Sequence, residues 1–126
     1  MKVLQVVEQA FRVTVEEQDD AILWLSRSML GAGAELSVLL SGNAALYAVL
    51  QQRQPALSLG DWQQTEPADL RGDVTGLVAA DVPVYVVAEE LEALGVEGRP
   101  LLEGVRRVAR SDLSRLYEQA DQVWHW

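Results

Sequence analysis

The sequence of 126 residues contains no cysteine and only one histidine, His125. The absence of cysteine excludes disulfides, thiolate metal sites and cysteine nucleophiles. With a single histidine, the chain lacks the several imidazole ligands of a histidine-based zinc site and has one candidate for the base of a Ser-His-Asp triad. We therefore predict no metal site and no cofactor, and we expect His125 to have a structural role.

Positive charge is scarce as well, because ten Lys and Arg residues stand against 19 Asp and Glu residues. The resulting net charge of −9 opposes nonspecific binding to nucleic acid and attachment to an anionic membrane. No segment approaches the ~20 consecutive apolar residues that span a bilayer. The apolar run Lys2–Val7 contains Gln5 and is followed by Glu8, which is not typical of a signal peptide. We expect a cytoplasmic protein that binds neither nucleic acid nor membrane.

The composition that remains, 49% hydrophobic and 23% charged, is ordinary for a globular protein. The length fits a single domain, residues 1–126. Short apolar runs alternate with helical patterns, which predicts an α/β fold with a mostly parallel sheet of about five strands. The expected strands are Lys2–Val7, Glu35–Leu40, Val82–Val87, a short strand near Gly104–Val108, and Gln122–Trp126.

The first expected helix follows Thr14-Val15-Glu16-Glu17, which matches a capping box. Ile22, Leu25 and Met29 then share one helical face, and Gly31 or Gly33 can end the helix. The later helices are expected at Ala44–Gln52 with Asn43 as N-cap, at Asp69–Ala80 interrupted by Gly72 and Gly76, after the strand Val82–Val87 with its end at Gly95, and at Asp112–Ala120 with Ser111 as N-cap. The segment Pro55–Glu66 is predicted to be a loop that Trp62 holds against the body.

Three segments resemble the DsrE/DsrF-like family of small α/β proteins: LSVLLSGNAALYAV, VPVYVVAEELEALGV and DLSRLYEQADQVWHW. The resemblance implies a flavodoxin-like three-layer fold, a homo-oligomer or hetero-oligomer with related subunits, and a role in intracellular sulfur relay. Many members carry sulfur on a cysteine at the end of the strand in the second segment. Counted back from Gly95, that cysteine falls at Val87, or at Ala88 if the alignment slips by one. Neither residue forms the thiolate that persulfide chemistry requires.

Ligands of open α/β sheets bind beyond the carboxyl ends of the strands. This rule selects the ligand-binding candidates Glu8, Ser41, Gly42, Asn43, Val87, Ala88 and Glu89. The amides that open the helix after Gly42 suit an anion or a polar ligand, although a plain turn with an asparagine cap explains the same residues. Glu8, Glu89 and Glu90 form a possible carboxylate cluster for acid/base chemistry or a hard cation, although acidic residues also favour the start of a helix.

Two further features suggest contacts with a partner. Trp124 and Trp126 alternate along the terminal strand, where they either form an oligomer interface or pack onto helices of their own subunit. The basic residues Arg106, Arg107, Arg110 and Arg115 either dock an acidic partner or a phosphorylated ligand, or pair with Glu103, Asp112 and Glu118.

Our leading hypothesis from the sequence is a non-catalytic DsrE/DsrF-like binding or scaffolding subunit without the sulfur-carrying cysteine. One alternative is a small-molecule enzyme that uses Glu8 and Glu89 as acid and base. Another is a purely structural oligomer without a ligand.

Overall fold

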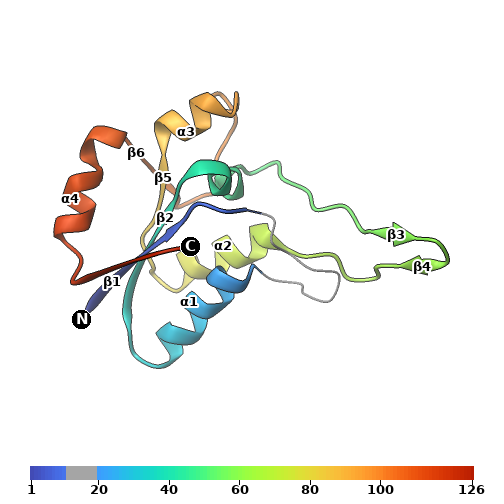
Figure 1. Cartoon of the computed structure of the whole chain (residues 1–126), viewed down its shortest axis with the longest axis horizontal. Coiled ribbons are helices and arrows are strands. Elements are labelled where there is room, and N and C mark those ends of the chain that lie inside the picture. Colours follow the sequence, from blue (N-terminus) through green and yellow to red (C-terminus); the bar gives the residue numbers. More distant parts are fainter. Residues whose placement is uncertain (11–19) are drawn as a thin grey trace.

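A five-stranded sheet forms the centre of the protein in a computed structural model that describes residues 1–10 and 20–126. The strand order is β6-β5-β2-β1-β7, and every neighbouring pair is parallel (Figure 1). This confirms the predicted α/β class with a parallel five-stranded sheet. The strands are β1 Lys2–Val7, β2 Glu35–Leu40, β5 Val84–Val87, β6 Arg106–Val108 and β7 Gln122–His125.

Helices cover the two faces of the sheet unequally. The larger core cluster lies between one face and the helices α1, α2 and α3 together with the 3-10 helix η1. On the other face, α4 is the one helix of the described residues that covers the smaller core cluster. The helices are α1 Ala21–Gly31, η1 Gly42–Ala48, α2 Leu70–Ala79, α3 Ala88–Ala93, η2 Arg110–Asp112 and α4 Leu113–Glu118. The expected three-layer arrangement is therefore present, with one thick layer of helices and one thin one.

Burial on both faces explains why β1 appears in the sequence as an almost continuous apolar run. Val3 and Val7 point into the larger cluster, whereas Leu4 and Val6 point into the smaller one. Gln5 is the single polar residue in the buried part of the strand and is 0% exposed. Its carboxamide must therefore find partners inside the protein, because an unpaired buried amide is costly.

Helix α1 begins at Asp20, whose carboxylate Oδ1 accepts hydrogen bonds from the backbone amides of Ile22 and Leu23 at 2.9 and 3.1 Å. The helix ends at Gly31, one of the two glycines expected to end it. The capping box at Thr14–Glu17 lies outside the residues that the structure describes.

The predicted helix Ala44–Gln52 is wrong in type and length, because the chain forms the 3-10 helix η1 and leaves it at Val49. The helix ends there because backbone groups at its end form hydrogen bonds with a segment about 50 residues further along the chain. The amide of Leu50 donates to the carbonyl of Pro100 at 2.9 Å, and the amide of Leu102 donates to the carbonyl of Ala48 at 2.8 Å. The predicted N-cap residue is also wrong: the N-cap position is Ser41, and no side chain caps the helix.

Helix α2 runs through both glycines that were expected to interrupt it. Asp69 caps the helix by accepting a 2.9 Å hydrogen bond from the amide of Gly72. Gly76 faces α1, and a Cβ at this position would meet the guanidinium of Arg27 at 3.4 Å. The glycine thus allows α1 and α2 to approach closely.

The predicted cap at Ser111 is also wrong. Ser111 lies inside η2, and α4 starts after it without a side-chain cap. Helix α4 is therefore shorter than the predicted Asp112–Ala120 and ends at Glu118.

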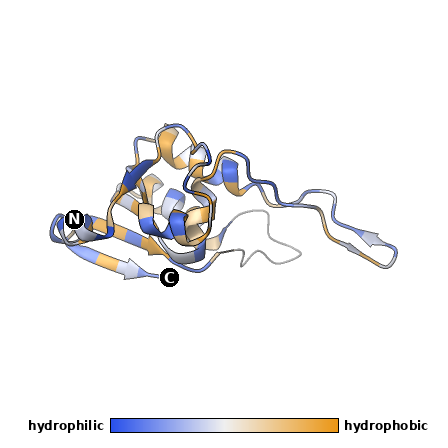
Figure 2. Cartoon of the chain, turned by 90° about the horizontal axis from the view of Figure 1, so that it is seen from above, coloured by the Kyte–Doolittle hydropathy of each residue, from blue (hydrophilic) through white to orange (hydrophobic). Residues whose placement is uncertain are grey.

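The segment Pro55–Glu66, predicted to be a loop held down by Trp62, instead projects from the body as a hairpin (Figures 1 and 2). It contains the antiparallel strands β3 Ser58–Leu59 and β4 Trp62–Gln63. Trp62 is 42% exposed and does not hold the segment against the body. We call residues 55–66 the arm.

Across the described ranges 1–10 and 20–126, no helix is long and apolar enough to cross a membrane.

Candidate functional site

The turn after β2 packs directly on the end of β1. The backbone amide of Ser41 donates to the carbonyl of Val7 at 2.9 Å, and that of Ala44 donates to the carbonyl of Glu8 at 3.3 Å. Gly42 has a φ of +52°, and a Cβ there would lie 3.1 Å from the carbonyl oxygen of Glu8. These contacts give the candidates Ser41 and Gly42 a role in joining two strand ends, while Asn43 is exposed beside them.

The candidate Glu8 is tied to the end of β7. Its backbone amide donates to the carbonyl of Trp126 at 3.0 Å. Its carboxylate Oε1 lies 3.7 Å from Nδ1 of His125, and both side chains are more than half exposed. Because water surrounds both side chains, the contact contributes little to stability.

Val87 and Ala88, where the family resemblance implies a cysteine, differ in accessibility. The side chain of Val87 is 1% exposed and packs in the smaller core cluster with Leu4, Val6 and Leu39. Ala88 is half-buried at the first position of α3. Of the two positions, only Ala88 is within reach of a partner or ligand.

Glu89 and Glu90 connect the ends of β5 and β6. The backbone amide of Arg110 donates to Oε2 of Glu89 at 2.7 Å, and the Arg110 guanidinium donates to Oε1 of Glu90 at 2.8 Å. After the carboxyl ends of β5 and β6, the chain continues into α3 on one face of the sheet and into α4 on the other. Open α/β sheets bind ligands at strand ends where the following helices go to opposite faces. In this chain the two carboxylates are engaged in holding Arg110 across that position.

The three carboxylates considered as a cluster have separate partners. Glu8 faces His125 near β1, whereas Glu89 and Glu90 hold Arg110 beside β5. Strand β2 lies between β1 and β5, which places their ends about 10 Å apart. Within the described part of the chain, no group of three or more His, Cys, Asp or Glu side chains is arranged to hold a metal ion. The carboxylate-enzyme alternative is not favoured.

The arginines around β6 are only partly neutralised. Arg110 pairs with Glu90, and Arg115 lies 3.9 Å from Asp112 in an exposed contact. Arg107 donates to the backbone carbonyls of Glu97 and Arg99 at 3.2 and 3.5 Å. Of the acidic partners predicted for this group, the contact between Arg115 and Asp112 is present. Arg106 is exposed, and no carboxylate of the described residues lies within 4.0 Å of its guanidinium.

The two tryptophans at the end of the chain make contacts within their own subunit. The indole Nε1 of Trp126 donates to Oε1 of the buried Gln5 at 2.6 Å. The Nε2 group of Gln5 lies 3.3 Å from the sulfur of Met29. The rings of Trp124 and Trp126 meet edge to face, with centroids 6.4 Å apart. These contacts favour the intrasubunit role that the sequence left open, although partner contacts of these residues remain a prediction.

A buried polar group, which the sequence analysis missed, lies at the start of α1. The hydroxyl of Tyr47 donates to Oδ2 of Asp20 at 2.9 Å, and the amide of Asp20 donates to Oδ2 of Asp73 at 3.1 Å. All three residues are at most 3% exposed. Their signal in the sequence was weak, because Asp20 looks like one of several acidic residues before a helix and Tyr47 like an ordinary core residue. The group joins α1, η1 and α2.

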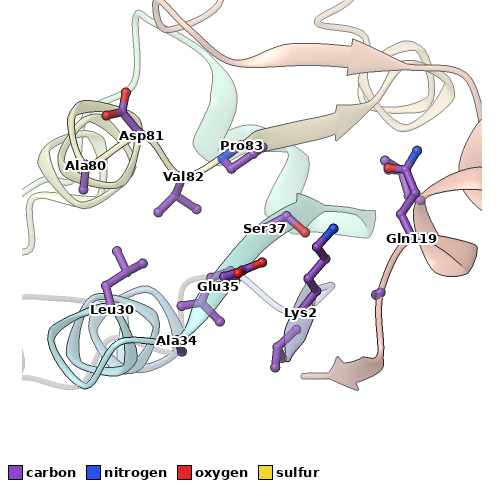
Figure 3. Close-up of a pocket in the computed structure, with 14 residues that line it drawn as sticks. Lys2, Leu30, Ala34, Glu35, Ser37, Ala80, Asp81, Val82, Pro83 and Gln119 are labelled. Atoms are coloured by element: carbon purple, nitrogen blue, oxygen red, sulfur yellow. The ribbon is translucent and has the colours of Figure 1, made fainter.

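A cavity of about 420 Å³ lies at the amino ends of the strands, opposite the edge that the sequence selected. Lys2, Glu35 and Ser37 come from the adjoining starts of β1 and β2, and Gln119 faces them from the end of α4 (Figure 3). A second cavity of about 340 Å³ lies near the base of the arm, beside Arg53 and Arg99. None of the predicted ligand-binding residues lines either cavity.

Comparison with known proteins identifies a solved structure with the same fold. The sequence matches no protein-family model and no curated protein. The structure is similar to the crystal structure of the YchN protein from E. coli, with a TM-score of 0.76 and 18% sequence identity over 99% of this chain and 98% of that one. YchN has a DsrE/DsrF-like fold, and this chain therefore has a DsrE-like α/β fold. At this level of identity the likeness concerns the fold alone.

Proposed function

We propose that the protein is a non-catalytic binding or scaffolding subunit of an intracellular sulfur-relay or sulfur-oxidation system. The observation that carries the proposal is the hydrocarbon at the expected sulfur position. Val87 is buried among apolar side chains, and Ala88 has no nucleophilic atom. On a DsrE-like scaffold, recognition of a partner remains available when the carrier atom is absent.

The side chains around that position support a role in binding. Glu89 and Glu90 hold the backbone and guanidinium of Arg110, so both carboxylates have structural partners. The surface around Ala88 is thereby held in one shape without a reactive group. A fixed surface of this kind suits the docking of a related subunit that does carry cysteine.

Incubation with a small-molecule persulfide donor, followed by intact mass measurement, tests the absence of sulfur chemistry. The protein is expected to gain no covalent sulfur, because it lacks a thiolate. The Ala88→Cys variant serves as the positive control, since it restores a thiol at the accessible position. Covalent sulfur on the unaltered chain would overturn the non-catalytic assignment.

Binding is tested separately, by native mass spectrometry of the chain mixed with a purified cysteine-bearing DsrE/DsrF-like subunit. A mixed complex is expected. The Ala88→Arg variant should weaken it by about tenfold or more, because an arginine at the accessible position obstructs docking and carries a charge into the contact. Gln119→Arg, near the opposite ends of the strands, is the matched control and should leave the complex unchanged. Absence of a mixed complex would refute the scaffolding role.

A further inference from the structure

The arm of residues 55–66 makes its regular contacts with itself. Ser58 pairs with Gln63 and Leu59 with Trp62, and the amide of Gln64 donates to the carbonyl of Leu57 at 2.8 Å. The arm extends away from the helices and the central sheet in both views (Figures 1 and 2). A two-stranded hairpin of this size is marginally stable in water without a surface to pack against. We therefore expect the arm to be stabilised by packing against another surface.

One face of the arm is apolar. Leu59 and Trp62 are directly opposite each other, so their side chains point to the same side, and Leu57 lies two residues before Leu59 on that side. Their exposed fractions are 44% for Leu57, 62% for Leu59 and 42% for Trp62. Exposed apolar side chains gathered on one projecting element are typical of a protein contact.

Charge indicates which surface receives the arm. The arm carries Asp61 and Glu66 and no basic residue. The chain as a whole has a net charge of −9, and most of its surface therefore repels the arm. A concentration of positive charge lies at the edge strand β6, where Arg106 and Arg107 are exposed and Arg110 follows. Arginine also stacks well on the face of a tryptophan ring such as that of Trp62.

The backbone of β6 is also suited to receive the arm. Among the described residues, strand β6 is the last strand on its side of the sheet and pairs only with β5, so its outer edge is available to a further strand. The opposite edge strand, β7, is a poorer receiver, because Glu118 and Asp121 precede it and its tryptophan contacts its own subunit. Addition of an extended segment to an open sheet edge is a common mode of recognition.

We propose that the arm of one copy docks against the outer edge of β6 in a second copy of this chain. The arm cannot reach its own β6, because its tip lies at one end of the longest axis while β6 and α4 lie toward the other (Figure 1). The contact thus joins two different surfaces and is heterologous, which produces a closed ring if the rotation between copies closes. This inference goes beyond the proposed function and stands on the arm and the sheet edge alone.

Two variants test the two sides of the contact independently, one in the arm and one in the edge strand β6. The arm variant Leu59→Ser/Trp62→Ser removes the apolar face, and the edge variant Arg106→Glu/Arg107→Glu reverses the charge of the receiving strand. Each variant alone is expected to weaken self-association by more than about tenfold, because tryptophan and arginine are frequent hot-spot residues. Arg115→Glu on α4 is the matched charge control and should associate like the unaltered protein. Circular dichroism checks that every variant is folded.

Mixing the variants gives the decisive measurement. The arm variant keeps an intact edge and the edge variant keeps an intact arm, so an equimolar mixture should form a 1:1 complex that does not grow further. Native mass spectrometry and sedimentation velocity detect it. The proposal is overturned if the unaltered chain is monomeric at every concentration, if the mixture forms no complex, or if both variants assemble normally. A ring lost through Trp124→Ala/Trp126→Ala but kept in the arm variant would place the interface at β7 instead. None of these results depends on sulfur chemistry, which is tested by the persulfide experiment.

Discussion

Trp126 and Gln5, 121 residues apart in the chain, are joined by a 2.6 Å hydrogen bond from the indole Nε1 to the carboxamide Oε1. Gln5 is fully buried in the middle of β1, so this bond satisfies a polar atom that water cannot reach. The last residue of the chain is thereby held against the sheet beside β1.

We predict that Trp126→Phe lowers the free energy of unfolding by about 1–3 kcal/mol, because it leaves Oε1 of Gln5 buried without its donor. Urea unfolding followed by circular dichroism measures the change. Trp124→Phe is the control, since the Nε1 group of Trp124 donates to Gln122 at the surface. The double variant Gln5→Leu/Trp126→Phe should recover part of the loss. Equal losses for the two single variants would contradict the role of Gln5.

The bond between Tyr47 and Asp20 leads to a similar prediction for the buried polar group. Tyr47→Phe removes the donor to Oδ2 of Asp20 and should cost about 1–3 kcal/mol of stability. Tyr117→Phe, at a side chain that is 37% exposed, should change stability by less than about 0.5 kcal/mol. Thermal or urea unfolding distinguishes the two. A neutral Tyr47→Phe variant would show that the hydroxyl contributes little.

Glu89 and Glu90 are expected to act differently on Arg110. Glu89→Ala removes the acceptor of the Arg110 amide, so that amide should exchange its hydrogen with water faster, by roughly tenfold for a loss of about 1.4 kcal/mol. Glu90→Ala removes an exposed ion pair with the side chain and should leave the exchange of the amide almost unchanged. Hydrogen exchange followed by NMR at Arg110 measures both. The same rate in the two variants would argue against the backbone anchor.

A side chain at position 42, now Gly42, should destabilise the protein. Its φ of +52° is unfavourable for other residues, and a Cβ would press on the carbonyl of Glu8. Gly42→Ala is therefore expected to destabilise the protein by roughly 1–2 kcal/mol. Gly31→Ala, at the end of α1 where a Cβ would meet nothing within 4 Å, should be neutral or stabilising. Urea unfolding of both variants tests the difference, and equal stabilities would refute the strain at Gly42.

Much of the fold could be predicted because its signals are local. The apolar runs at Lys2–Val7 and Glu35–Leu40 match β1 and β2 to the residue. The helix after Ser41 could not be predicted in the same way, since it ends where the backbone of Leu50 bonds to Pro100. Glycines in α2 looked like interruptions in the sequence, but Gly76 serves the contact with Arg27 on α1.

The candidate site was predicted less well than the fold. The strand ends could be located, because they follow from the strands. The hydrogen-bond and ion-pair partners of these residues could not be predicted. The contacts of Glu89 with Arg110 and of Glu8 with His125 join segments that are far apart in the sequence. The projecting arm also escaped prediction, because a polar segment with Pro and Gly has the same composition whether it lies on the body or leaves it.

The amino-acid sequence by itself determined the chain positions of the five central strands, the acidic surface and the absence of a thiol, because each depends on residue identity or on neighbours along the chain. Tertiary structure alone decided that Val87 is sealed in a core, that Gln5 is satisfied by Trp126, and that an apolar arm and a basic edge lie on opposite sides of the molecule. The physical reason is that burial, pairing of polar atoms and the direction of a hairpin depend on contacts that exist only once distant segments have packed together.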